Sequence, residues 1–80
     1  METELKLITL KEMMALLGLT KTRQWEQSRD GLLTPPVRMG RRTLYVYHEI
    51  QEIIKHRIKG ESDEQIKQLV IELIEKRGKL

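Results

Sequence analysis

The 80-residue sequence contains no cysteine and no phenylalanine, and it has only two histidines. Without cysteine the chain can form no disulfide, no thiolate metal site and no cysteine nucleophile, and we expect neither a metal nor another cofactor. Its uninterrupted apolar stretches, such as Met13–Leu17 and Leu69–Ile71, are far shorter than the roughly 20 apolar residues of a membrane-spanning helix. These absences predict a cytoplasmic protein that does not cross a membrane.

Catalytic motifs are also lacking. A chain of this length forms one small domain, residues 1–80, with one thin core and little room for a substrate pocket. It contains no GxSxG motif and no glycine-rich phosphate loop. Glu49 and Glu52 lie one helical turn apart, but without a pocket we expect both on a solvated helix face, and His48 and His56 lack metal-site spacing. We therefore expect no enzymatic activity and no small-molecule ligand.

The positive charge is concentrated in the middle of the chain. The formal net charge is +3, but residues 21–42 alone carry six basic and two acidic side chains, a local net charge of +4. Residues 1–20 and residues 43–77 each carry a net charge of −1. A local basic segment indicates a polyanionic partner, of which nucleic acid is the usual one. A solvated charged face is the alternative, and composition alone does not decide between them.

A first helix is predicted after the short extended segment Leu5–Ile8. Thr9 and Glu12 have the spacing of a capping box, in which each residue satisfies a backbone group of the other. Apolar residues then follow at helical spacing, at Leu10, Met13, Met14 and Leu17. Gly18 suits the end of this helix, because glycine adopts the left-handed conformation that often terminates helices.

A second, polar helix is predicted to begin after Thr20, a suitable N-cap, and to end at Asp30. Trp25 is its only large apolar residue. A lone tryptophan in a small domain usually belongs to the core, which we expect here, and stacking on a nucleic-acid base is the alternative. Two short helices joined by a tight turn over residues 9–30 form a helix-turn-helix.

A β-hairpin is predicted in the next part of the chain. Pro35–Pro36 separates it from the second helix, because proline cannot continue a helix. Two alternating segments then flank Gly40–Arg42, which predicts a hairpin, or wing, over residues 36–47 with basic residues at its tip. Tyr45 and Tyr47 are two residues apart and would share one face of the second strand.

Two further helices are predicted over residues 48–59 and 62–77. Ser62 and Gln65 form a second capping box. The apolar face of the third helix consists of Ile50, Ile53, Ile54 and Ile58. The apolar stripe of the fourth helix consists of Ile66, Leu69, Val70, Leu73 and Ile74. Ile71 lies beside this stripe. The predicted fold is mainly α with a small β-hairpin, in the order helix, helix, hairpin, helix, helix.

The order and spacing of four motifs resemble the MerR-like winged helix-turn-helix superfamily. The motifs are Thr9–Glu12 through Gly18–Thr20, Gly31–Arg38, Thr43–Ile50 and Gly60–Ile66. They resemble, in turn, the opening of the helix-turn-helix, the start of the wing, the end of the wing and the link between the two helices after it. The resemblance covers about residues 7–74. In size the chain is closest to phage AlpA-type regulators and excisionase-like proteins.

The resemblance implies sequence-specific binding to double-stranded DNA by a small transcriptional regulator or excisionase-like protein of a phage or mobile element. The second helix would enter the major groove and the wing would contact the DNA backbone. The DNA-binding candidates are Thr20, Lys21, Thr22, Arg23, Gln27, Arg38, Arg41, Arg42 and Tyr45. Because one small domain makes limited contact with DNA, we expect a homodimer or cooperative copies on DNA.

Two alternatives stay open from the sequence. The scaffold could be a protein-interaction module that uses the basic segment as a docking surface. It could also be a DNA-packaging protein that resembles the small terminase subunits of some phages. For Arg41 and Arg42 alone, a charged turn that keeps strand edges from pairing is the simpler explanation. Their position beside a helix-turn-helix favours phosphate or minor-groove contact instead.

Overall fold

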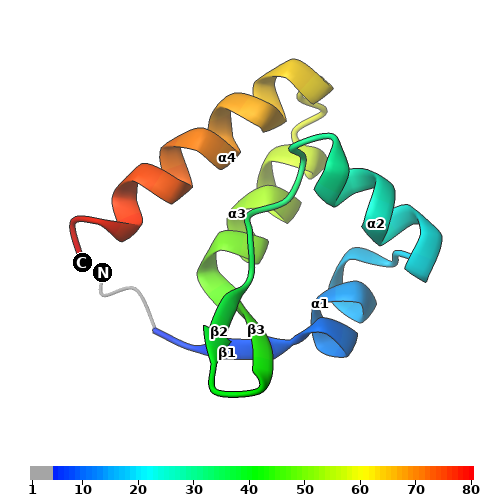
Figure 1. Cartoon of the computed structure of the whole chain (residues 1–80). Helices are drawn as coiled ribbons and strands as arrows, with labels where there is room; N and C mark the ends of the chain where they lie inside the picture. Colours follow the sequence, from blue (N-terminus) through cyan, green and yellow to red (C-terminus); the bar gives the residue numbers. More distant parts are fainter. Residues whose placement is uncertain (1–4) are drawn as a thin grey trace.

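The computed structural model describes residues 5–80, which form four helices and a three-stranded sheet (Figure 1). In chain order the elements are β1 (Leu7–Thr9), α1 (Leu10–Leu17), α2 (Lys21–Arg29), β2 (Val37–Met39), β3 (Arg42–Val46), α3 (Tyr47–Ile58) and α4 (Asp63–Arg77). The prediction of a mainly α chain with a small β element is confirmed. The domain predicted over residues 1–80 includes residues 1–4, which lie outside the described part. Within that part, no helix is both long and apolar enough to cross a membrane.

The start of α1 is the capping box that the sequence predicts. The Thr9 hydroxyl accepts a hydrogen bond of 3.1 Å from the Glu12 amide, and the Glu12 carboxylate accepts one of 3.2 Å from the Thr9 amide. These bonds from Thr9 lower the pKa of the Glu12 carboxyl below its usual value. Gly18, with a φ of 67°, ends the helix and lets the Leu19 amide donate to the Met14 carbonyl at 2.9 Å.

The sheet contains one strand more than the predicted hairpin. Its order is β1-β3-β2, with both strand pairs antiparallel. Ile8 of β1 lies opposite Tyr45 of β3, so the segment predicted only as extended becomes an edge strand beside the hairpin. The sequence signal for this strand is weak, because a three-residue strand shows little alternation. The pairing attaches the hairpin to the chain just before α1.

The second strand of the hairpin ends one residue earlier than predicted. Tyr47 is the first residue of α3, so it does not share a strand face with Tyr45. The first amides of a helix have no partner within the helix, and the Tyr47 amide instead donates to the Lys6 carbonyl at 2.8 Å. The Lys6 ammonium also lies 5.1 Å from the centre of the Tyr47 ring. These contacts hold the start of α3 against β1.

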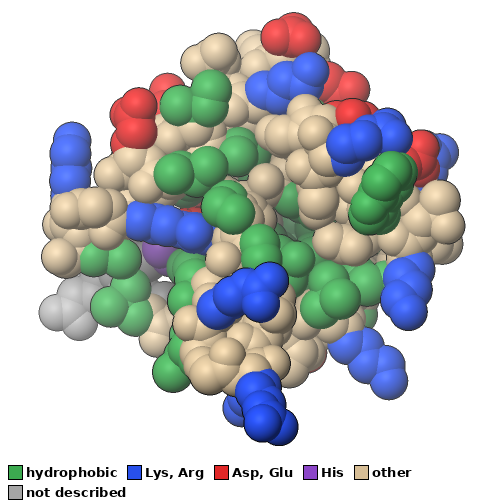
Figure 2. All heavy atoms as spheres, viewed as in Figure 1, with side chains coloured by type: hydrophobic (Ala, Val, Ile, Leu, Met, Phe, Trp, Pro, Cys, Tyr) green, Lys and Arg blue, Asp and Glu red, His purple; other side chains and the backbone are tan. Residues whose placement is uncertain are grey.

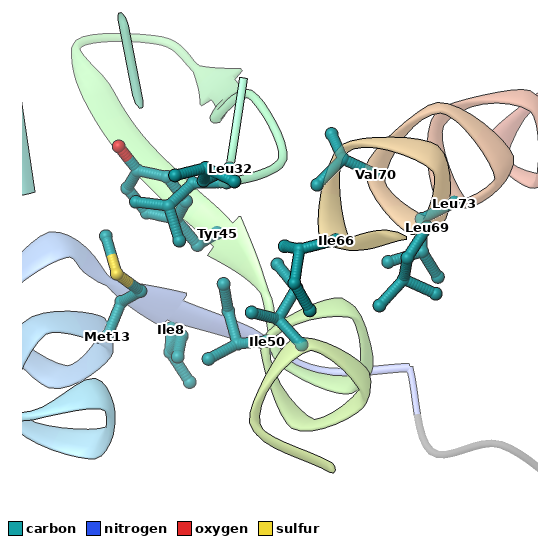
Figure 3. Packing of buried hydrophobic residues seen from close by; sticks show 11 residues of the cluster. Ile8, Met13, Leu32, Tyr45, Ile50, Ile66, Leu69, Val70 and Leu73 are labelled. Atoms are coloured by element: carbon teal, nitrogen blue, oxygen red, sulfur yellow. The ribbon is translucent and has the colours of Figure 1, made fainter. Parts of the chain in front are cut away.

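The core lies between the sheet, α1, α3 and α4, as Figure 3 shows. Its buried members are Ile8, Met13, Leu32, Leu33, Tyr45, Ile50, Ile53, Ile66, Leu69, Val70 and Leu73. The predicted apolar face of α3 is confirmed at Ile50 and Ile53, whereas Ile58 at its end is 80% exposed. The stripe of α4 is likewise buried except for Ile74, which is exposed together with Ile71. Burial of these side chains provides the main driving force for folding.

The expectation that Glu49 lies on a solvated helix face is wrong. Its side chain is 1% exposed, in the first turn of α3. Arg77, at the end of α4, donates to Oε1 at 2.6 Å through Nη2 and to Oε2 at 2.7 Å through Nε. The same Nη2 donates to the Pro35 carbonyl at 2.7 Å. A partner 28 residues away therefore satisfies this carboxylate and permits its burial.

Candidate nucleic-acid interface

α2 lies on the surface, and the residues on either side of it largely fix its position (Figure 1). None of its own side chains is buried. Leu32 and Leu33, which follow it, belong to the core, and Leu19, which precedes it, packs against the same core. From within the helix, Oε1 of Gln27 accepts a hydrogen bond of 3.3 Å from Nη2 of Arg57 in α3. α2 is therefore anchored mainly from its ends and from its inner side, and its outer face is free.

The helical period of α2 separates an inner from an outer face. Gln24 and Gln27 are half-buried, whereas Thr22, Trp25 and Arg29 are exposed. Gln27, a candidate base reader from the sequence, therefore faces α3 and is bonded to it rather than to solvent. Trp25, which was not among the candidates, lies on the outer face with 61% of its surface exposed. Its exposure was not apparent from the sequence, because apolar content alone does not show which face of a short polar helix is covered.

The expectation that Trp25 belongs to the core is wrong. Leu32 and Leu33 are in the core, so α2 packs on the protein without a large apolar side chain of its own. The Arg29 guanidinium lies 4.9 Å from the centre of the Trp25 ring, a cation–π contact. Nε of Arg29 also donates to Oδ1 of Asp30 at 3.1 Å. The aromatic ring is thus supported by a charged neighbour and remains accessible.

Four candidate residues gather at the N-terminal end of α2. Thr20 is the N-cap, and its hydroxyl accepts a hydrogen bond of 3.2 Å from the Arg23 amide. Lys21, Thr22 and Arg23 form the first turn and are exposed. The positive end of the helix dipole adds to the charge of the two basic side chains, and this combination favours an anion such as phosphate.

The β2–β3 hairpin carries the second group of candidates. Met39 and Arg42 are paired across the strands, and Gly40 in the turn has a φ of 62°. Glycine adopts this left-handed conformation without the strain that other residues incur. Arg38, Arg41 and Arg42 are all exposed. The turn therefore presents guanidinium groups at the tip of a short hairpin.

Tyr45 does not join these basic residues. It is 5% exposed and lies beside Leu32 in the core (Figure 3). Burial raises the pKa of its hydroxyl above the usual value, because the charged phenolate is disfavoured away from water. Its partner across the strands, Ile8 of β1, is buried in the same core. We therefore assign Tyr45 to the core and leave it out of the candidate interface.

The cations in the first turn of α2 and in the hairpin differ from many in α3 and α4, and from Arg29 at the end of α2, in having no acidic partner among the described residues. Four of those in α3 and α4 form ion pairs: Lys55 with Glu52, Arg57 with Asp63, Lys67 with Glu64 and Arg77 with Glu49. Within residues 5–80, no carboxylate lies within 4.0 Å of Lys21, Arg23, Arg38, Arg41 or Arg42. Figure 2 shows basic side chains around α2 and at the hairpin tip on one side of the molecule. We call these five residues the basic face.

Apolar grooves lie beside the helices. One of about 370 Å³ includes Leu16, Leu19 and Ile53, and another of about 510 Å³ runs between Pro35–Pro36 and Ile71 of α4. Within the described part of the chain, no three or more acidic or histidine side chains are grouped so that they could hold a metal ion. Among other groups, the described surface offers cationic contact from the basic face and apolar contact from the grooves and Trp25.

Comparisons with known proteins add no relative to this description. No family model, curated protein or solved structure matches the chain. Function is therefore inferred from the arrangement of α2, the hairpin and their side chains, together with the resemblance of the motifs.

Proposed function

We propose that the chain binds double-stranded DNA sequence-specifically as a winged helix-turn-helix. In this proposal α1 and α2 are the helix-turn-helix, α2 enters the major groove, and the β2–β3 hairpin is the wing on the backbone. Two features of α2 support its role: it is capped at Thr20, and none of its side chains is needed to fill the core. A helix that reads base edges must present a free face of this kind.

The basic face carries the proposal. Its cations lie on the two elements that meet DNA in a winged helix-turn-helix, and no carboxylate of the described residues neutralises them. Guanidinium groups at a hairpin tip can make forked hydrogen bonds to phosphate oxygens. The basic residues at the start of α2 combine with the positive end of the helix dipole. A surface of this kind gives affinity for the DNA backbone, and α2 would supply the sequence preference.

The motif resemblance suggests the kind of DNA-binding protein. We place the chain with MerR-like proteins, and by size with small AlpA-type regulators and excisionase-like proteins of phages. Such a protein acts by its position on DNA, by blocking or recruiting polymerase or by shaping DNA for a recombinase. A single module of this size contacts about 600–1,000 Å² of DNA, so useful affinity requires a homodimer or cooperative copies.

The test is selection of bound fragments from a random duplex pool and from DNA that flanks the gene. The purified protein is mixed with the pool at low and moderate salt, in the presence of nonspecific competitor. Recovery of a common sequence supports the proposal and supplies the site. Binding that competitor abolishes at both salt concentrations contradicts it, and the basic face would then be examined as a docking surface for a protein.

A further inference from the structure

We propose that Trp25 contacts thymine methyl groups in the major groove and so contributes to the sequence preference of α2. This inference rests on the proposed DNA binding. Trp25 is 61% exposed, on the outer face of the helix, between the basic first turn and Arg29. It is also the only tryptophan in the chain. Trp25 is not a member of the core cluster, so most of this large apolar side chain is available for contact.

The chemistry of the major groove selects the partner of an indole ring. Base edges in that groove present hydrogen-bond donors and acceptors, and the C5-methyl group of thymine is their apolar feature. An indole has a single N–H donor and no acceptor, so it cannot form the paired hydrogen bonds by which arginine or glutamine reads a base. Its favourable contact is therefore with methyl groups. An A·T pair, or two successive thymines, would bury the exposed part of Trp25.

Arg29 acts as a positioning residue for this contact. Its guanidinium lies against the Trp25 ring and is also bonded to Asp30, which follows at the end of α2. A ring supported by such a neighbour loses less side-chain entropy when it binds than a freely rotating one. The ion pair with Asp30 also offsets the charge of Arg29, so this arginine is not a member of the basic face.

The test replaces thymine by uracil, one position at a time, in the duplex recovered by selection. Uracil lacks only the C5-methyl group, so each replacement removes one apolar contact. A buried methyl contributes roughly 0.8 kcal/mol, and we expect wild-type affinity to fall about fourfold at one or two positions. The Trp25→Ala variant should bind the original duplex more weakly and should not discriminate thymine from uracil at those positions. Ile71→Ala, an exposed apolar residue of α4, is the matched control and should keep the wild-type pattern.

The emission of Trp25 gives a second readout on the unmodified protein. In the free protein acrylamide should quench this exposed tryptophan efficiently, and saturating DNA should shield it. Wild-type protein that binds the duplex but shows neither thymine preference nor shielding overturns the inference and leaves the DNA-binding function standing. A Trp25→Ala variant that weakens binding yet keeps the full thymine preference also overturns it. Absence of selective binding to any duplex would remove the proposed function itself, a result that the selection experiment detects first.

Discussion

Arg77, near the end of α4, clamps both carboxylate oxygens of Glu49 and donates to the carbonyl of Pro35 through the same guanidinium. These contacts join the start of α3, the end of α4 and the connection that leads into β2. The hydrogen bond to Glu49 raises the pKa of Arg77, although burial opposes this effect. The clamp thus fixes the base of the hairpin against the two C-terminal helices.

Loss of Arg77 should destabilise the fold because it leaves a buried carboxylate without a partner. We expect Arg77→Met to lower the free energy of unfolding by about 3 kcal/mol. The double variant Glu49→Gln/Arg77→Met should recover part of that loss, since it removes the buried charge. Urea unfolding measures the stability of both variants. It is followed by circular dichroism rather than by fluorescence, because the exposed Trp25 is a poor reporter of core packing. Lys67→Met, which removes an exposed ion pair with Glu64, is the control and should change stability by less than about 1 kcal/mol. Equal stability of Arg77→Met and wild type would show that the clamp contributes nothing.

The clamp shows where sequence patterns stop being informative. The helices, their caps and most of their apolar faces follow from local spacing, because capping boxes and helical periodicity involve residues three or four positions apart. Glu49 looked like a solvated residue because its partner lies 28 positions away, and no local pattern connects the two. The edge strand β1 was not predicted for a related reason, because it pairs with β3, which is far away in the sequence.

The wing arginines should govern the salt dependence of DNA binding. Replacing Arg41 and Arg42 by alanine removes two phosphate contacts, and the slope of log affinity against log salt should fall in magnitude by about 1.8 for B-DNA. The loss should be similar for all duplex sequences, because backbone contacts carry no sequence information. Fluorescence anisotropy at several salt concentrations measures the slope. The matched control is Lys76→Ala/Lys79→Ala, at the C-terminal end of the chain away from α2 (Figure 1). A slope that stays unchanged in the wing variant would contradict the contact of the wing with the backbone.

The N-cap of α2 should matter more for DNA binding than for global stability. Thr20→Ala removes the hydrogen bond that the Thr20 hydroxyl accepts from the Arg23 amide. This should lower the stability of α2 by about 1 kcal/mol. The effect should stay local, because α2 buries none of its side chains. We therefore expect faster hydrogen exchange in α2 and weaker DNA binding, with little change in the midpoint of urea unfolding. Ser62→Ala removes the equivalent cap of α4, which carries four core residues, and should lower global stability while affecting α2 exchange little. If both variants changed the hydrogen-exchange rates of α2 to the same extent, the conclusion that the Thr20 cap stabilises α2 locally would be wrong.

The sequence predicted the exposure of the basic residues of the candidate interface, but it did not predict the placement of Gln27 and Trp25. Lys21, Arg23 and the hairpin arginines are exposed as expected, because burying a charge without a partner is costly. Gln27 was expected to face DNA and Trp25 to face the core, but Gln27 is bonded to α3 and Trp25 is exposed. The rotation of a short polar helix about its axis depends on which neighbouring residues fill the core. That choice is made by Leu32 and Leu33, outside the helix itself.

Tyr45 provides a further test, because the motif resemblance places it near DNA and the structure places it in the core. Tyr45→Phe removes only the hydroxyl, and we expect DNA affinity within about twofold of wild type, since a core ring makes no contact with phosphate. Tyr45→Ala should instead lower the free energy of unfolding by about 3 kcal/mol or more through the cavity that it creates. Anisotropy and urea unfolding separate the two effects. A tenfold loss of affinity in a fully folded Tyr45→Phe variant would return Tyr45 to the interface.

The burial of the Tyr45 hydroxyl can also be tested without DNA, through the dependence of protein stability on alkaline pH. The pKa of Tyr45 is raised in the folded protein, so the unfolded chain loses this proton first as pH rises. The contribution of Tyr45 to stability is therefore complete below the unfolded-state pKa of about 10, and is lost as pH rises through the folded-state value. Urea midpoints of wild type and Tyr45→Phe should run parallel below about pH 9 and diverge above it, with the wild type falling faster. Tyr47→Phe, which changes the less buried tyrosine, is the control. Parallel curves for wild type and Tyr45→Phe up to about pH 11 would show that the hydroxyl is solvated in the folded protein.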